Sequence, residues 1–190
     1  MPDVELSFSR DEYAGRLAKV RRSMESRGIE VLVAADPSNM SWLTGYDGWS
    51  FYTPQAVVVD HEGEPWWWGR RMDANGARRT VYMDEGRILD YSDDHVMSTE
   101  KHAYGQLAGI LDGMGHGSAR IGVELDNYYY SAASHQHLCD GLPDAEVVDA
   151  TALVNWQRGI KSSQELEYMR RAARIVELMH SRIREVLEPG

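Results

Sequence analysis

Two closely spaced pairs of arginines are the side chains best placed to bind a charged group in this sequence. Arg70-Arg71 and Arg78-Arg79 flank the segment Met72–Gly76. A guanidinium binds a carboxylate or another small anion through two parallel hydrogen bonds. Arg70 and Arg71 are therefore candidates for an anion site, although a solvated helix face or an interface salt bridge is the commoner role of such pairs.

The other reactive side chains form no recognisable catalytic motif. The sequence has no G-x-S-x-G elbow, and its single cysteine, Cys139, is expected on a helix among apolar neighbours, as a small buried residue. His135 and His137 are two residues apart, which points them in different directions on a helix. The acidic run before His95 is more typical of a solvated loop than of a divalent-metal site. We therefore expect no catalytic residue and no metal ligands in this chain.

An aromatic segment with almost no charge is the most unusual local feature. It runs from Met40 to Gln55, MSWLTGYDGWSFYTPQ, and it is too polar and too rich in glycine for a buried strand. Trp49, Phe51 and Tyr52 lie in its second half. Since large aromatic side chains are enriched at interfaces, this segment is expected to be a binding loop or part of an interface.

The run Trp66-Trp67-Trp68 predicts a strand with large side chains on both faces. Trp66 and Trp68 share one face, and Trp67 lies on the other. We expect one face to belong to the core and the other to form an interface, where tryptophan is enriched.

Length and composition predict one globular domain with the beginning of a second. The chain has 190 residues, of which 43% are hydrophobic and 26% charged, and this length supports a core without disulfides. The net charge of −10 and the lack of a dense basic cluster argue against a nucleic-acid partner. The first ten residues are no signal peptide, and no apolar run approaches the length of a membrane span. A cytoplasmic protein without a membrane partner is expected.

Strands and helices alternate along most of the chain. The expected helices begin after Ser9 and Asp36, end at Gly28 and near Gly45, and recur over residues 99–111 and 127–139, with 70–80 helical or irregular. The expected strands cover residues 29–34, 56–59, 65–68, 87–91, 120–124 and 145–148, the second and third paired as a hairpin. This alternation predicts an α/β fold with a largely parallel or mixed sheet.

The end of the chain, residues 158–190, is a polar joint followed by one long amphipathic helix. Ser162 and Glu165 form a capping-box pattern, and apolar residues recur at helical spacing up to about Leu187. A helix draws most of its stability from packing an apolar face, and nothing follows this one. The helix is expected to pack on the preceding domain, on another chain or on a domain that is missing from this chain, and we favour the last. We therefore expect a domain over residues 1–157, and after it the start of a further domain.

Four segments, in this order, resemble the amino-terminal domain of the creatinase/prolidase family, the pita-bread metallopeptidases. They are Arg27–Val33, Asp36–Tyr46 (like the family's x-N-x-x-Y-L-T-G-Y/F), Arg120–Glu124 (like its R-I-G-V/I-E strand) and Asp149–Arg174 (like its linker and first catalytic-domain helix). The resemblance covers essentially the whole chain. It implies a three-layer α/β domain with a mixed central sheet, followed by the first helix of a missing pita-bread domain.

The resemblance also implies an enzyme longer than this chain. In the metal-dependent members, two aspartates, a histidine and two glutamates of the catalytic domain hold two metal ions, and none of those positions lies here. No cofactor is therefore expected in this chain, a divalent metal is possible in the missing domain, and the chain alone is expected to be inactive. The family further implies a homodimer in which the amino-terminal domain of one subunit covers the active site of the other.

Within the family, the aromatic segment resembles the corresponding loop of the ectoine hydrolases. In creatinases this loop reads approximately S-F-G-R-P-x-A, and its phenylalanine and arginine reach the partner's substrate. Phe51 matches the phenylalanine, but Thr53 replaces the arginine, which removes the bidentate partner of a substrate such as creatine. Ectoine is a small cyclic amidine with a carboxylate, and the rings of Trp49, Phe51 and Tyr52 suit an amidinium cation. The resemblance implies that these residues and Thr53 bind the substrate in trans, or that the rings pack a dimer interface.

Three functions stay open at this point. The first is part of an ectoine hydrolase-like enzyme, and the second is part of an Xaa-Pro dipeptidase or a creatinase. Turnover of their substrates by the full-length protein separates these two. The third is a non-catalytic binding or dimerisation module, which predicts a reading frame that ends near Gly190.

Overall fold

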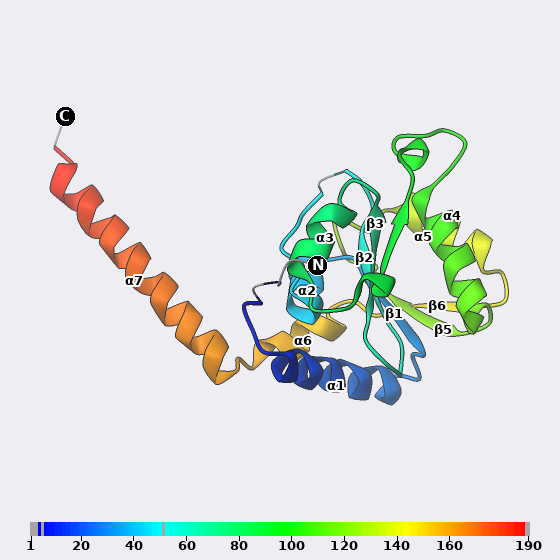
Figure 1. Cartoon of the computed structure of the whole chain (residues 1–190), viewed down its shortest axis with the longest axis horizontal. Coiled ribbons are helices and arrows are strands. Elements are labelled where there is room, and N and C mark those ends of the chain that lie inside the picture. Colours follow the sequence, from blue (N-terminus) through cyan, green and yellow to red (C-terminus); the bar gives the residue numbers. More distant parts are fainter. Residues whose placement is uncertain (1–3, 5, 51, 189–190) are drawn as a thin grey trace. The chain divides into compact units, whose positions relative to one another are not determined.

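A computed structural model of the chain describes residues 4, 6–50 and 52–188 (Figure 1). The chain divides into two compact units, Met1–Gln157 and Arg158–Gly190. The first unit holds a sheet and the helices that cover it, and the second holds one long helix. That the second unit begins a catalytic domain stays a prediction.

Six strands of the first unit form one mixed sheet (Figure 1). Their spatial order is β4 (Ile88–Tyr91), β3 (Trp66–Arg70), β2 (Ala56–Val59), β1 (Val31–Ala34), β5 (Arg120–Val123) and β6 (Glu146–Asp149). β2 pairs antiparallel with both β1 and β3, and the other neighbouring strands are parallel. These pairings confirm the predicted hairpin and the predicted mixed α/β sheet.

Helices cover both faces of the sheet, so the domain has three layers (Figure 1). One face packs against α1 (Arg10–Ser26), α2 (Pro37–Thr44), α3 (Ala74–Thr80) and α6 (Leu153–Gly159). The other packs against α4 (Ala103–Leu111) and α5 (Ala132–Gly141). Successive residues of a strand point to opposite faces. Val31 and Val33 accordingly lie in the second core, and Leu32 and Ala34 lie in the first.

The three consecutive tryptophans fill both cores. Trp67 lies in the first core and Trp68 in the second, and both have an exposed fraction of 0%. Trp66 packs against the second core from a half-buried position. The expectation of an interface on one face of this strand is therefore wrong, because helices already cover both faces.

Local polar contacts set the boundaries of α1 and α2 as predicted. Ser9 Oγ accepts a hydrogen bond from the N–H of Glu12 at 3.2 Å and caps α1. Asp36 caps α2 in the same way, and Gly45 ends that helix with a φ of 82°. Glycine adopts this left-handed conformation without the strain that other residues incur.

The helix expected over residues 127–139 begins later and ends slightly later, as α5. Asn127 Oδ1 accepts a hydrogen bond from the N–H of Tyr129 at 2.8 Å, which makes a local turn. Such side-chain hydrogen bonds offer the backbone an alternative to helix. Ser131 then provides the cap from which α5 starts.

The helix expected over residues 99–111 also begins late, as α4. Ser98 Oγ accepts hydrogen bonds from the N–H groups of Glu100 and Lys101, each at 3.1 Å, which holds this stretch as a turn. His102 is the residue that caps α4. The stretch 70–80 contains the end of β3, a turn and α3.

The second unit is dominated by α7 (Ser163–Val186). Ser162 and Glu165 form the predicted capping box, with hydrogen bonds of 3.2 and 2.7 Å. Considered alone, the unit leaves the apolar residues of α7 exposed, among them Leu166, Met169, Val176, Met179 and Ile183. Over the described part of the chain, no helix is both long enough and apolar enough to cross a membrane.

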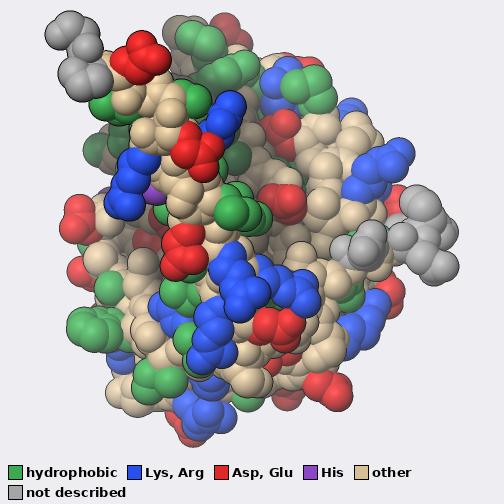
Figure 2. Space-filling view, turned by 90° about the vertical axis from the view of Figure 1, so that its left-hand side faces the viewer, with side chains coloured by type: hydrophobic (Ala, Val, Ile, Leu, Met, Phe, Trp, Pro, Cys, Tyr) green, Lys and Arg blue, Asp and Glu red, His purple; other side chains and the backbone are tan. Residues whose placement is uncertain are grey.

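The surface mixes charges of both signs. On the face in Figure 2, Lys and Arg side chains lie close to Asp and Glu side chains. Ion pairs of the first unit include Arg21 with Asp60 at 3.7 Å and Arg78 with Glu85 at 3.3 Å. Pairs of this kind, exposed to solvent, contribute little to stability individually.

Candidate functional site

The aromatic loop, defined as residues 46–55, leaves α2 at Gly45 and enters β2 at Ala56. Gly45 lies tightly against neighbouring groups. A Cβ atom there would be 2.8 Å from the hydroxyl oxygen of Tyr13 and 3.0 Å from the carbonyl oxygen of Thr80. The loop therefore starts from a fixed point of the first core that only glycine fits.

The inner side of the loop is held by hydrogen bonds to Asp73. Thr53 Oγ1 donates to Asp73 Oδ2 at 3.3 Å, and Gln55 Nε2 donates to the same oxygen at 3.2 Å. Thr53 also shares a hydrogen bond with Ser50, and only 5% of its surface is exposed. Thr53 thus anchors the loop, and its predicted contact with a substrate stays a prediction.

The outer side of the loop carries exposed aromatic rings. Trp49 is 59% exposed and Tyr52 is 67% exposed. Trp49 Nε1 donates a hydrogen bond to the hydroxyl oxygen of Tyr129 at 2.8 Å, which ties the loop to the segment that follows β5. Phe51, the third predicted aromatic contact, lies outside the described residues.

A hollow of about 410 Å³, here called the aromatic hollow, opens beside these rings. Its volume falls in the range of small-molecule sites, roughly 300–1,000 Å³. Its lining comes from the aromatic loop, from the segment after β4 and from the starts of α4 and α5. Tyr52 and Thr53 belong to this lining. No sequence motif marks its other polar members as binding residues: His95, Ser98, His102, Tyr128, Tyr129, Ser131 and Ser134.

Hydrogen bonds determine which ring nitrogen carries the proton in the two histidines of the aromatic hollow, His95 and His102. Nδ1 of His102 accepts from the N–H of Tyr104 at 3.2 Å, so the neutral ring carries its proton on Nε2. Nδ1 of His95 faces two acceptors, the carbonyl oxygen of Ser92 at 3.3 Å and Oδ1 of Asp94 at 2.9 Å, so it carries a proton itself. In their neutral forms, His102 thus donates through Nε2 and His95 accepts through Nε2.

The position of His102 predicts a loss of stability on acidification. Burial lowers the pKa of His102, and nearby His137, whose ring stacks on it at 4.6 Å, and His95 lower this pKa further. The unfolded state therefore binds more protons than the folded state once the pH falls below the ordinary histidine pKa of about 6.5. The stability that neutral His102 contributes is present above that pH and is lost as the pH falls through the folded-state pKa.

We expect His102→Asn to remove this part of the pH dependence, because asparagine keeps an N-cap acceptor but does not titrate. The measurement is the free energy of unfolding in urea between about pH 7.5 and about pH 5, which brackets the histidine range. His180→Asn, at an exposed position on α7, is the control and should keep the original slope. Equal slopes for the two variants would contradict the assignment to His102.

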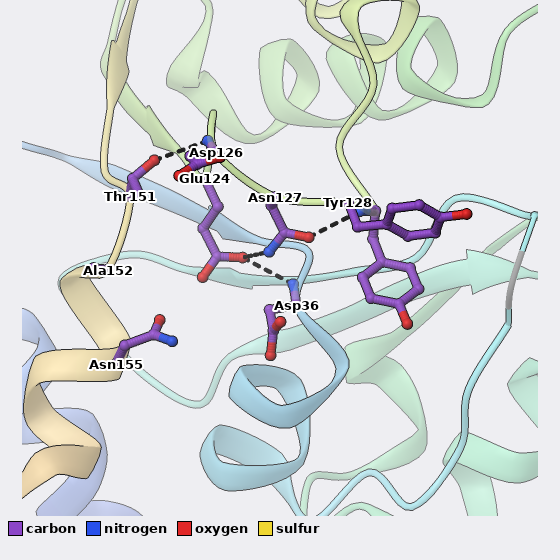
Figure 3. Close-up of a pocket in the computed structure, with 9 residues that line it drawn as sticks. Asp36, Glu124, Asp126, Asn127, Tyr128, Thr151, Ala152 and Asn155 are labelled. Atoms are coloured by element: carbon purple, nitrogen blue, oxygen red, sulfur yellow. Dashed lines mark hydrogen bonds between the residues drawn. The ribbon is translucent and has the colours of Figure 1, made fainter.

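A second hollow of about 190 Å³, here called the acidic hollow, shares Tyr128 and Tyr129 with the first (Figure 3). It lies beyond the carboxyl ends of the parallel strands β1, β5 and β6, an edge where α/β sheets commonly bind ligands. Asp36 follows β1, Glu124 follows β5 and Asn155 lies on α6 after β6. Figure 3 shows Glu124 extending from β5 toward the other two.

Glu124 is a buried carboxylate that joins these elements. Its Oε2 accepts hydrogen bonds from the backbone N–H groups of Ala35 and Asp36 at 2.7 and 2.8 Å. Its Oε1 accepts one from Asn39, which also donates to Asn155 Oδ1 at 2.9 Å. Burial raises the pKa of Glu124, and these donors oppose the shift. The network ties β5 to the start of α2 and to α6.

Comparison with known proteins agrees with this architecture. Residues 16–160 match the family profile of the creatinase/prolidase N-terminal domain. The chain belongs to this family. The resemblance drawn from the four sequence segments is thereby confirmed.

Relatives of this creatinase/prolidase N-terminal domain include several hydrolases. The chain is 58% identical over 191 residues to ectoine hydrolase from Halomonas elongata. The matched region covers 100% of this chain and 48% of that protein. It is 26% identical over 198 residues to creatinase from Bacillus sp., covering 98% of this chain and 43% of that protein. The chain spans about half the length of these curated relatives.

A solved Xaa-Pro dipeptidase from Bacillus anthracis shares the fold. Its TM-score is 0.74 at 16% sequence identity, and the match covers 94% of this chain and 44% of that chain. At this level of identity the likeness extends to the fold and not to the substrate. The three-layer architecture predicted from the sequence is thus confirmed by a solved relative.

The predicted arginine pair of this creatinase/prolidase domain binds acidic residues of its own chain. Arg70 Nε donates to Asp93 Oδ1 at 2.7 Å, and Arg71 Nε donates to Asp90 Oδ1 at 2.9 Å. The hydrogen bond from Arg70 lowers the pKa of Asp93. Both arginines lie at the end of β3 and its following turn, and their role toward an anion or an interface stays a prediction.

The described residues of the domain offer no preformed metal centre. Over residues 4, 6–50 and 52–188, no group of three or more His, Cys, Asp or Glu side chains is placed to hold a metal ion. A divalent metal in the remainder of the protein stays a prediction. Cys139 is half-buried rather than fully buried, with its sulfur 3.7 Å from Nε2 of His135.

Proposed function

We propose that this chain is the amino-terminal half of an ectoine hydrolase-like enzyme, which opens a cyclic amidine by hydrolysing a C–N bond. The proposal rests on the 58% identity to ectoine hydrolase over the whole chain. On this proposal, the catalytic residues and any divalent metal belong to the other half, so the 190-residue chain is inactive alone. The complete enzyme is a cytoplasmic homodimer in which this domain covers the active site of the partner subunit.

The exposed rings of the aromatic loop support the covering role. Trp49 and Tyr52 project from a loop whose inner side is anchored through Thr53 and Asp73. Aromatic faces attract delocalised cations such as an amidinium. A loop that is anchored on its inner side and carries exposed rings can therefore contact a cationic ring with a smaller loss of loop entropy.

The anchoring of Thr53 also bears on creatine as an alternative substrate. Thr53 stands where the creatinase loop carries an arginine, and its hydroxyl is already bonded to Ser50 and Asp73. It offers no guanidinium for a substrate carboxylate. The position therefore favours ectoine over creatine as the substrate.

The substrate is tested with the full-length enzyme, offered ectoine, creatine and an Xaa-Pro dipeptide side by side. We expect turnover of ectoine alone. Turnover of creatine or the dipeptide in its place would refute the substrate assignment, but it would not affect the family membership. A reading frame that ended near Gly190 would instead favour the non-catalytic binding module.

Trp49→Ala is expected to lower kcat/KM for ectoine by about tenfold, the effect of losing one desolvated cation–aromatic contact. Phe51→Ala should act in the same direction. Trp156→Ala is the matched control, since this tryptophan is 75% exposed and belongs to α6 rather than to the loop. Loop variants that match the control in kcat/KM would show that the rings only pack an interface.

Action in trans is tested by mixing two inactive or weakened enzymes. One carries Trp49→Ala, and the other carries an intact loop but an inactivated catalytic half. If the loop serves the partner's active site, mixed dimers pair an intact loop with an intact catalytic half and regain activity. Recovery would be absent if each loop served its own subunit.

A further inference from the structure

The aromatic hollow combines a small-molecule volume with a lining of polar, aromatic and apolar side chains. The described lining residues are tyrosine, serine, threonine, histidine and apolar side chains, without Lys, Arg, Asp or Glu. A ligand with a net charge would leave that charge unbalanced in such a site. The hollow therefore favours a ligand that is neutral overall.

The hydrogen bonds already made by the lining leave more donors than acceptors. His102 donates through Nε2, because its Nδ1 accepts from the backbone. Ser98 Oγ accepts from two backbone N–H groups at 3.1 Å, and the hydroxyl oxygen of Tyr129 accepts from Trp49, so each has its own O–H to donate. His95, when its ring is neutral, offers an acceptor through Nε2. A carboxylate, which only accepts hydrogen bonds, matches this excess of donors.

Two helices begin at the hollow and strengthen the preference for a carboxylate. His102 caps α4, and Ser131 caps α5, with Ser134 in the first turn of α5. All three residues line the hollow. The amino end of a helix carries a partial positive charge. The two helix ends add positive potential without adding an ionised side chain.

Exposed aromatic rings also belong to the lining of the hollow. Tyr52 and Tyr128 both line the hollow and are 67% and 74% exposed. Their faces suit a planar cationic group. A ligand can therefore place its carboxylate among the donors and its cation against the rings.

From this arrangement we infer that the aromatic hollow binds a small zwitterion with a carboxylate and a planar cation, using residues of this one chain. The choice of ligand rests on the proposed function, since ectoine has both groups. The site differs from the covering role because it needs neither the partner subunit nor the catalytic half. The domain would then hold substrate itself, beside the loop that covers the partner's active site.

The test is isothermal titration of the 190-residue chain with ectoine, with acetate as a competitor for the carboxylate position. We expect saturable binding that acetate weakens. Tyr129→Phe keeps the ring but removes its hydroxyl, and His102→Asn keeps the helix cap but removes the Nε2–H donor. Each should weaken binding by about fivefold, the effect of one lost hydrogen bond. Circular dichroism checks that both variants fold.

Two matched controls use residues of α7, which are not among the lining residues of the hollow. Tyr168→Phe and His180→Asn make the same chemical changes and should leave the affinity unchanged. Absence of saturable ectoine binding would overturn the inference, and so would binding that both hollow variants leave intact. Hydrolysis by the full-length enzyme is scored separately. If the full-length enzyme hydrolyses ectoine but the 190-residue chain does not bind it, only the inferred site in the hollow is refuted. If the chain binds ectoine but the full-length enzyme does not hydrolyse it, only the proposed function is refuted.

Discussion

Replacing Glu124 with alanine is expected to lower the free energy of unfolding by about 3–5 kcal/mol, because several buried donors lose the same acceptor at once. Glu124 is only 3% exposed. Its removal takes the acceptor from the N–H groups of Ala35 and Asp36 and from one amide N–H each of Asn39 and Asn127, while Asn39 keeps its hydrogen bond to Asn155. Each unpaired buried donor costs about 1–3 kcal/mol, and relaxation of the site recovers part of the sum. Urea denaturation measures the loss.

Two further variants separate charge from position. Glu124→Gln keeps the length of the side chain but turns an NH₂ group toward donors, so a loss of about 1–3 kcal/mol is expected. Glu146→Ala removes a carboxylate of β6 that is 64% exposed, and its effect should stay within about 1 kcal/mol. If Glu124→Ala were as mild as Glu146→Ala, the network would not join β5 to α2 and α6 in the way described.

Trp67→Ala and Trp68→Ala are each expected to destabilise the domain by about 3–5 kcal/mol, the usual effect of emptying a large core position. Both side chains are fully buried, but in different cores. Trp67 packs against Tyr46 with ring centroids 5.3 Å apart. Trp68 packs against Tyr91 and Tyr104 at 5.1 and 5.2 Å, so either truncation leaves a cavity.

Trp66→Ala is the matched control on the same strand. Trp66 is half-buried, so its truncation removes less apolar contact, and a loss of about 1–2 kcal/mol is expected. Thermal or urea unfolding of the three variants gives the comparison. Two large losses and one small loss would agree with a sheet covered on both faces. A small loss for either Trp67 or Trp68 would argue that one face is open.

The architecture of the first unit was largely predictable because its signals are local. Ser9 and Asp36 cap the helices that follow them, and Gly45 ends α2, as their types predict. The strands appear as short apolar runs, and the hairpin of β2 and β3 follows from a short polar turn. Local chemistry also explains the errors, since the side chains of Ser98 and Asn127 make turns where helical periodicity alone predicts helix.

The aromatic loop was recognisable in the sequence, but its surroundings were not. Trp49 and Tyr52 are exposed and stand out by composition. The partner of Trp49 is Tyr129, 80 positions away in the chain. His102 enters the same hollow because it caps α4. No periodicity or spacing links these residues.

By itself the sequence determined the family, the alternation of strands and helices, and the aromatic character of the loop, because each depends on neighbouring residues. The tertiary structure alone decided that all three tryptophans serve the core, that Thr53 anchors the loop and that Arg70 and Arg71 pair within the chain. The physical reason is that these roles depend on burial and on partners far away in the sequence. Such partners meet only when parallel strands and their crossover helices bring distant segments to one edge of the sheet.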